Sequence, residues 1–396
     1  MDTPTGIESP PGHFASWQPG AAPRRIPEGL AWTLLPGSDL VIQMHLQPLG
    51  RIETIESEIG FYFTDQAPTQ QPVKIALNNF DIDLPPGSMS NVVRDSFTLP
   101  GQADLLGLLP HTHYLGRRIE SIAHLPDGTQ RPLFLIPDWD FNWQGDYQFK
   151  NPVRLPSGTR IEMAITFDNS TNNARNPFSP PRHTRYGPNT TDEMAELWMQ
   201  LLPTSPTDAA AFRKAAFDRG LRDVNWVNRE RLRINPRDAA AHVNLGRVLL
   251  AQRRPADATK EFEEAARLDP QLDEAHYFLG LTHRLANRPA QAIEAFTRAV
   301  EINPDHARAH GNLGLVLLDA QQLEKAGLHL SQAARLDPRD ALALAKLGAL
   351  RVLQGQPAEA IPLLERALSL DPSDRESAQF LELARRRLNP GPVPLP

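Results

Sequence analysis

The chain has 396 residues, contains no cysteine and carries a formal net charge of −6 at neutral pH. This length allows two domains, each with a hydrophobic core of its own. The lack of cysteine excludes disulfide bonds and thiolate chemistry, and the mildly acidic balance argues against binding to nucleic acid or to an anionic membrane.

Residues 1–30 are rich in proline and glycine and lack the apolar core of a signal peptide. We interpret them as a linker or as the remnant of a preceding segment. No apolar run in the sequence is long enough to span a bilayer.

Residues 31–203 have the pattern of short β-strands. Apolar and polar residues alternate in bursts such as Asp39–Leu46 and Arg160–Phe167. Turn signals separate the bursts, among them Pro126-Asp127-Gly128. Many short strands between proline and glycine turns predict an all-β antiparallel sandwich or jelly roll.

Three segments of this β region carry candidate metal ligands. His111 and His113 are two residues apart and would project from the same face of a strand. Met194 ends a Thr191-Asp192-Glu193-Met194 segment, and His45 ends an alternating strand. Two imidazoles and a thioether form a soft ligand set suited to copper(I). On their own, two histidines on a strand are more often an ordinary surface feature.

These segments resemble the copper type II, ascorbate-dependent monooxygenases, which include peptidylglycine α-hydroxylating monooxygenase and dopamine β-hydroxylase. The resemblance covers roughly residues 15–203 and falls on the family's C-terminal β-domain, in the form found in bacterial members. It implies a jelly-roll fold and copper bound by His111, His113 and Met194. By the same resemblance, His45 matches a ligand of the second, electron-supplying copper.

The family's chemistry is hydroxylation of a C–H bond by dioxygen, with ascorbate as the reductant. The resemblance implies that this chain lacks the first catalytic β-domain, which supplies the other ligands of the second copper. It also implies a periplasmic or extracellular location, although no signal peptide is visible. Leu109, Glu196 and Trp198 replace the residues with which peptide-hydroxylating members hold their substrate, so the substrate does not carry over.

Residues 204–235 are predicted to form an irregular helical pair that joins two domains. From there the sequence repeats every 34 residues, with Leu-Gly ten residues after each of the first four prolines. The prolines that mark the repeat are Pro236, Pro270, Pro304, Pro338 and Pro372. This pattern is typical of tetratricopeptide repeats, so residues 236–390 are predicted to form about four repeats with a capping helix, followed by a 391–396 tail.

A repeat solenoid predicts a protein or peptide partner on its concave face. His242, His276 and His310 recur at one position of successive repeats, and we interpret them as packing or partner contacts. The main functional hypothesis is a copper monooxygenase with an interaction domain. The alternatives are an inactive repeat scaffold with a copper-binding or vestigial β-domain, and a metal enzyme that uses iron or zinc.

Overall fold

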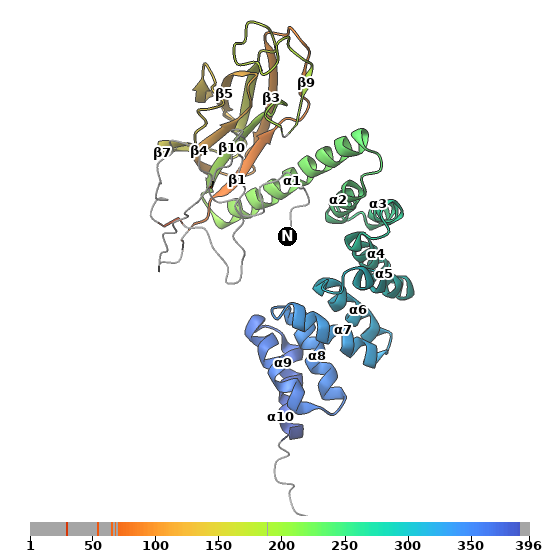
Figure 1. Ribbon diagram of the computed structural model, residues 1–396. Helices are drawn as coiled ribbons and strands as arrows, with labels where there is room; N and C mark the ends of the chain where they lie inside the picture. Colours follow the sequence, from red (N-terminus) through yellow and green to blue (C-terminus); the bar gives the residue numbers. More distant parts are fainter. Residues whose placement is uncertain are drawn as a thin grey trace, which may run out of the picture. The chain divides into compact units, whose positions relative to one another are not determined.

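The structure is a computed structural model that describes residues 29–30, 54, 65, 68, 70–187 and 189–388. The chain divides into two compact units, residues 1–223 and 224–396. Strands predominate in the first unit, and the second consists of helices (Figure 1). Almost all of the predicted 1–30 segment, His45, most of 31–69 and the 391–396 tail lie outside the described residues.

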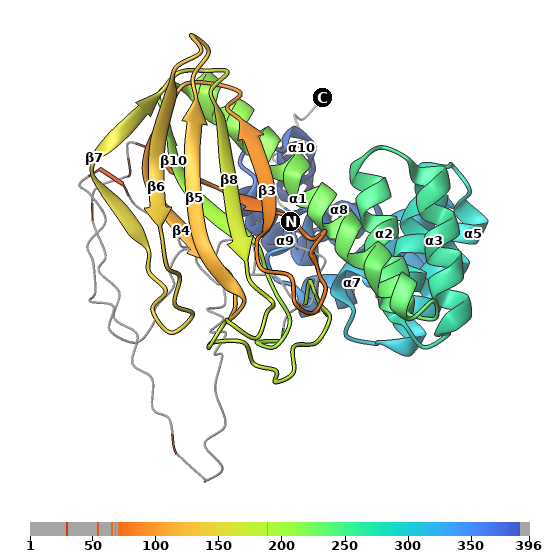
Figure 2. The same cartoon turned by 90° about the horizontal axis from the view of Figure 1, so that it is seen from above.

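The described strands of the first unit pair in antiparallel fashion (Figure 2). One sheet has the order β1-β10-β4-β7, a second has the order β3-β8-β5-β6, and β2 pairs with β9. The strands are β1 Val73–Asn78, β2 Asp83–Leu84, β3 Asn91–Thr98, β4 Ala103–His111, β5 Gly116–His124, β6 Gln130–Ile136, β7 Tyr147–Leu155, β8 Arg160–Phe167, β9 Thr184–Arg185 and β10 Glu196–Pro203.

Both four-stranded sheets contribute to one hydrophobic core. In β10, Leu197, Met199 and Leu201 are fully buried and the residues between them are half-buried, as the period of a strand requires. Ile161, Met163 and Ile165 of β8 are fully buried in the same core from the other sheet. The prediction of an antiparallel β region is therefore confirmed, whereas the jelly-roll topology remains a prediction.

Helix α1, Pro206–Ile234, follows the last strand. The predicted irregular helical pair at 204–235 is wrong, because these residues form one continuous helix of 29 residues. No proline follows Pro206 within the helix, and its single glycine, Gly220, costs too little to break it. Ser205 caps the first turn, since its Oγ accepts from the Asp208 N–H at 3.1 Å.

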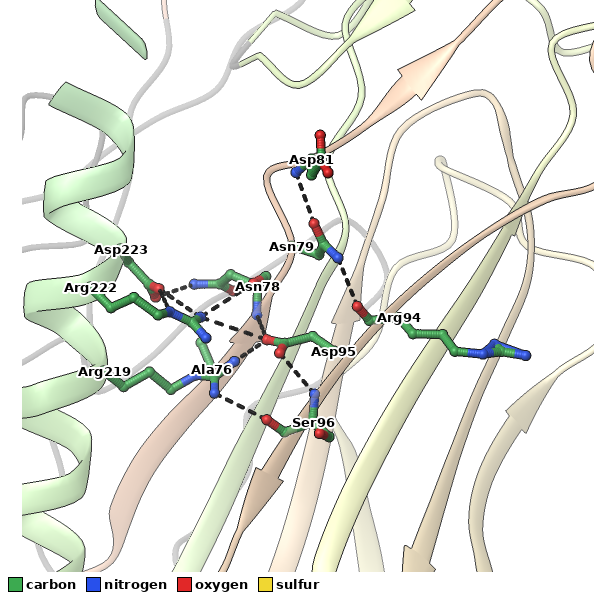
Figure 3. Close-up of polar contacts among 10 residues, drawn as sticks. All are labelled: Ala76, Asn78, Asn79, Asp81, Arg94, Asp95, Ser96, Arg219, Arg222 and Asp223. Atoms are coloured by element: carbon green, nitrogen blue, oxygen red, sulfur yellow. Dashed lines mark hydrogen bonds and ion pairs between the residues drawn. The ribbon is translucent and has the colours of Figure 1, made fainter. Parts of the chain in front are cut away.

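The first half of α1 packs on the β-sheets. Phe212 is fully buried in the β core, and Arg219 lies two turns further along the same side of the helix. The Arg219 guanidinium pairs with Asp95 of β3 and donates to the Ala76 and Ser96 carbonyls (Figure 3). The Asp223 carboxylate accepts from Asn78 Nδ2 at 3.0 Å. These contacts fix this half of α1 to β1 and β3.

The second unit contains antiparallel helix pairs with a final single helix, which confirms the predicted tetratricopeptide solenoid. The helices are α2 Ala239–Ala251, α3 Pro255–Leu268, α4 Asp273–Leu285, α5 Pro289–Ile302, α6 Ala307–Asp319, α7 Leu323–Leu336, α8 Ala341–Leu353, α9 Pro357–Leu370 and α10 Arg375–Leu388. A Cβ atom at Gly280 would overlap the buried ring of Phe296. The glycine thus lets the two helices of a repeat cross closely, and the large residue fills the gap.

Candidate functional site

The structure brings the two predicted copper-ligand histidines together at one end of β4. His111 is the last residue of that strand and pairs with Glu196 of β10. His113 lies in the following loop rather than in the strand, so strict alternation does not apply to it. The two imidazole rings nevertheless lie side by side, with centroids 5.2 Å apart and planes at 84°.

Each imidazole is oriented by an acceptor at Nδ1. His113 Nδ1 is 3.0 Å from the main-chain oxygen of Asp192, which can only accept, so this nitrogen carries the proton. His111 Nδ1 is 2.7 Å from Gln144 Oε1, and Gln144 Nε2 in turn donates to the Phe141 carbonyl at 3.0 Å. In the neutral rings, Nε2 therefore holds the lone pair that a metal ion would take.

Glu193 ties the Thr-Asp-Glu-Met segment to the histidine loop. Its buried carboxylate accepts from the Thr112 hydroxyl and the His113 N–H at 2.9 Å, and from the Leu115 N–H at 2.5 Å. Burial raises the pKa of Glu193 to about 7, against the opposing effect of these hydrogen bonds. The loop conformation that holds both imidazoles depends on this one side chain.

Met194 follows Glu193 directly. The antiparallel register of β10 and β4 ends at the pair Glu196 and His111, two residues after Met194. Met194 is half-buried. His45, the ligand predicted for a second copper, lies outside the described residues.

Within the described ranges, no group of three or more His, Asp or Glu side chains is arranged to hold a metal ion. The predicted donor set at the end of β4 is of a different kind, with two adjacent imidazoles and the thioether of Met194, which follows Glu193 in sequence. Such a set fits a soft ion such as copper(I) better than calcium or magnesium. Asp138 forms ion pairs with Arg117 and Arg175, which supports a structural role for its carboxylate.

In the second unit, the positive charges of three arginines act on Tyr277, and we call Arg247, Arg284 and Arg308 the arginine cluster. They lie on α2, α4 and α6, the first helices of successive repeats. The Arg308 guanidinium lies 5.5 Å from the centre of the Tyr277 ring. Burial raises the pKa of the Tyr277 hydroxyl, while the positive charges of the cluster act in the opposite direction. Glu274 is the negative charge nearby that partly offsets them.

The fourth repeat has a hollow of about 310 Å³ whose lining combines apolar residues such as Leu342 and Phe380 with Lys346, Asp371, Asp374 and Glu376. Leu342 and Ala345 of α8 occupy the positions that Arg308 and Gly311 hold one repeat earlier. Phe380 of α10 closes the hollow, and an ion pair of 2.8 Å between Lys346 and Glu376 lies at its rim. The lining of this hollow is therefore partly apolar and partly acidic, unlike the arginine cluster.

Sequence reasoning missed several of these residues. Gln144 contacts His111 across 33 residues of sequence, and Glu193 contacts the histidine loop across 78–81 residues. The sequence patterns predicted no role for either side chain. The arginine cluster had a usable signal, because Arg247, Arg284 and Arg308 all fall on first helices of the 34-residue repeat.

Sequence models of the tetratricopeptide repeat family match residues 208–273, 243–307, 277–341 and 343–376. The C-terminal half of the chain is therefore built of tetratricopeptide repeats, and the match begins within α1. A comparison with curated proteins gives no match. The monooxygenase resemblance of the first unit gains no support from these comparisons and depends on its motifs alone.

Solved structures similar to the chain are repeat proteins. MamA is 24% identical, and the match covers 43% of this chain and 96% of MamA with a TM-score of 0.35. YrrB, described as a TPR protein with an unusual peptide-binding site, is 21% identical over 44% of this chain and 89% of its own, with a TM-score of 0.35. PilF of Pseudomonas aeruginosa is 24% identical over 39% and 75%, with a TM-score of 0.34. Among the described residues, no helix is long and apolar enough to cross a membrane.

Proposed function

We propose that this protein is an interaction protein whose repeats bind an acidic segment of a protein partner. The observation that carries the proposal is the arginine cluster, in which three positive charges on successive first helices act on Tyr277 and the Arg308 guanidinium lies over its ring. Arginine is well suited to carboxylates because its planar fork donates two parallel hydrogen bonds. In the hollow at α8 and α10, Leu342 and Phe380 add an apolar surface for an aliphatic or aromatic side chain of the same partner, beside the carboxylates of Asp371, Asp374 and Glu376.

The test uses a fluorescein-labelled peptide of alternating Glu and Leu residues and a matched peptide of Gln and Leu, followed by fluorescence anisotropy on the full chain. We expect the Glu peptide to bind more tightly. Its affinity should fall with added salt, because the exposed charges of Arg284 and Arg308 are screened. Arg284→Gln and Arg308→Gln should each weaken binding about tenfold, the loss of one charge-assisted contact.

Arg298→Gln is the matched control. It also removes one positive charge, but Arg298 lies on α5, the second helix of its repeat, where it pairs with Glu301 at 3.3 Å. Its variant should bind like the unchanged protein. Equal binding of the two peptides would show that the carboxylates are not recognised, and an equal loss in Arg298→Gln would show that non-specific charge explains the binding.

A second function is proposed for the first unit: copper binding, and with it monooxygenase activity of the resembled kind. It is favoured by the two adjacent imidazoles whose Nδ1 atoms are both held by acceptors. His111, His113 and Met194 would hold the ion, which when bound supplies dioxygen activation for C–H hydroxylation with ascorbate as reductant. A role for His45 in a second copper site, and a periplasmic or extracellular location, belong to this proposal.

In that function, residues of this chain orient the two imidazoles that would bind the ion. Gln144 and the Asp192 carbonyl keep the proton on Nδ1 of each ring, so that Nε2 is the binding atom. Glu193 holds the loop between β4 and β5 through its contacts to Thr112 and Leu115. The Phe141 ring, 5.5 Å from the His113 ring, covers one side of the site with apolar surface.

Copper content after reconstitution under reducing conditions tests the proposal, with a His111→Ala, His113→Ala double variant for comparison. We expect about one tightly bound copper per chain, lost in the double variant and retained in His276→Ala, a change in the repeats. Ascorbate consumption should follow copper content. If zinc or iron is retained in preference to copper, the site belongs to another metal enzyme. If no metal is bound specifically, the copper proposal fails and only the interaction function remains.

A further inference from the structure

Two histidines of the third repeat are in direct contact. His310 on α6 and His329 on α7 approach with their Nδ1 atoms 3.0 Å apart, and their rings are tilted by 30° with centroids separated by 5.2 Å. His310 is 7% exposed and His329 is half-buried. His310 Nε2 also lies 3.0 Å from the main-chain oxygen of Pro304.

These contacts fix the proton positions. A carbonyl oxygen can only accept, so His310 Nε2 carries a proton and its Nδ1 holds the lone pair in the neutral ring. The proton between the two rings must then come from His329 Nδ1. Burial lowers the pKa of both imidazoles, which favours two neutral rings that share one hydrogen bond.

A divalent metal ion can replace the proton between the rings. With zinc–nitrogen bonds of about 2.0–2.1 Å in tetrahedral geometry, two ligand nitrogens lie about 3.3 Å apart, close to the separation seen here. Moving the His329 proton to Nε2 leaves a lone pair on each of the two Nδ1 atoms that face each other. His310 already has the outer contact typical of a metal-bound imidazole, an N–H donated to a backbone carbonyl.

The neighbouring repeats indicate that packing does not require the second imidazole. At the position equivalent to His329, the first repeat has Glu261, which pairs with His242 at 2.8 Å, and the second has Ala295. His276 of the second repeat keeps the carbonyl contact, to Pro270 at 3.2 Å, without a histidine partner. The imidazole pair is thus a property of the third repeat and not of the repeat fold.

A hollow of about 300 Å³ opens onto the pair and is lined by Asp305, Leu328, Gln332 and Arg335 as well as the two histidines. It has room for water molecules that would complete a coordination shell. Across the described part of the chain, no third His, Asp or Glu joins the pair in a metal-holding group. We propose that His310 and His329 form a two-imidazole site for a divalent transition-metal ion such as Zn²⁺, with water as the remaining ligands.

Zinc titration of the full chain by isothermal calorimetry tests this site. The chain carries His111→Ala and His113→Ala, so that the first unit's histidine pair cannot contribute and the outcome is independent of the copper proposal. We expect one Zn²⁺ per chain with a micromolar dissociation constant. His329→Ala should weaken binding at least tenfold, whereas His276→Ala, which removes an imidazole without a histidine partner, should leave it unchanged.

A gain-of-site variant keeps the test valid even if His329→Ala unfolds the repeat. Ala295→His should create the same pair with His276 and raise the stoichiometry to two Zn²⁺ per chain. No zinc binding above the level of the His329→Ala variant, or an unchanged stoichiometry in Ala295→His, would overturn the proposal. The imidazoles would then be a hydrogen-bonded pair only.

Discussion

Replacing Arg219 by methionine should lower the free energy of unfolding of the first unit by about 3 kcal/mol. Methionine keeps much of the side-chain volume but removes the guanidinium from Asp95, whose side chain is only 15% exposed. Removing one partner of a buried ion pair costs about 3–5 kcal/mol, because the other charge stays buried. The lower end applies here, since the Asn78 and Ser96 N–H groups still donate to Asp95 at 2.9 and 2.8 Å.

The distribution of tryptophan makes this loss measurable. Five of the six tryptophans lie within residues 1–223, only Trp226 lies in the second unit, and Trp139 is 1% exposed in the β core. Urea unfolding followed by tryptophan fluorescence therefore reports on the first unit, whereas far-UV circular dichroism is dominated by the helical repeats. The fluorescence midpoint should fall in Arg219→Met while the dichroism transition of the repeats stays in place.

Lys214→Met provides the control on the same helix. Lys214 pairs with Asp218, but both side chains are exposed, at 76% and 54%, so its loss should cost less than about 0.5 kcal/mol. The double variant Arg219→Met, Asp95→Leu removes the uncompensated Asp95 carboxylate, and at least about 1 kcal/mol should be recovered. The reasoning fails if Arg219→Met costs no more than the control, or if the double variant recovers nothing.

Three further predictions concern single side chains. The folded-state pKa of Glu193, about 7, lies above its ordinary 4.5, so its stabilising contribution is present at low pH and lost as pH rises through about 7. Between about pH 5 and 8, the free energy of unfolding of the unchanged chain, followed by fluorescence, should fall by up to about 3 kcal/mol relative to that of Glu193→Gln. Parallel pH profiles of the two proteins would contradict this. Gly280→Ala should destabilise the repeats by about 1–3 kcal/mol, because the new methyl group forces Phe296 aside; the loss is measured by circular dichroism. The control Gly220→Ala has open space around it and should be neutral or stabilising by up to about 1 kcal/mol. Gly355 has a φ of 76°, so its replacement by alanine should lower the free energy of unfolding of the repeats by about 1 kcal/mol. An unchanged free energy would show that the turn relaxes.

The sequence predicted best what repeats. Four in-phase copies of a 34-residue pattern identified the solenoid, since each glycine and large residue is confirmed by the same close packing in the next copy. The connector at 204–235 was predicted wrongly because it occurs once, and a long polar helix with one glycine lacks a clear period. The β region was predicted as a class, because alternation reveals strands but not the order in which they pair.

The histidine loop shows the same limit at the level of a site. His111 and His113 could be paired from their spacing, because neighbours two residues apart stay neighbours in most conformations. The groups that orient them come from distant segments, Gln144 after β6 and Glu193 before β10. No local pattern specifies such contacts, so a single sequence identifies donors more readily than the side chains that determine which donor atom faces a ligand.

Within the repeats, the histidine position illustrates how a solenoid can acquire a site without changing its packing. The first imidazole is held by the fold in at least two repeats, through the Pro270 and Pro304 carbonyls. The residue nineteen positions later faces that imidazole from the second helix and has a different chemistry in each repeat: Glu261, Ala295 and His329. One half of a chelate is thus repeated for structural reasons, and a single substitution supplies the other half. The Ala295→His variant would repeat that step experimentally in the second repeat.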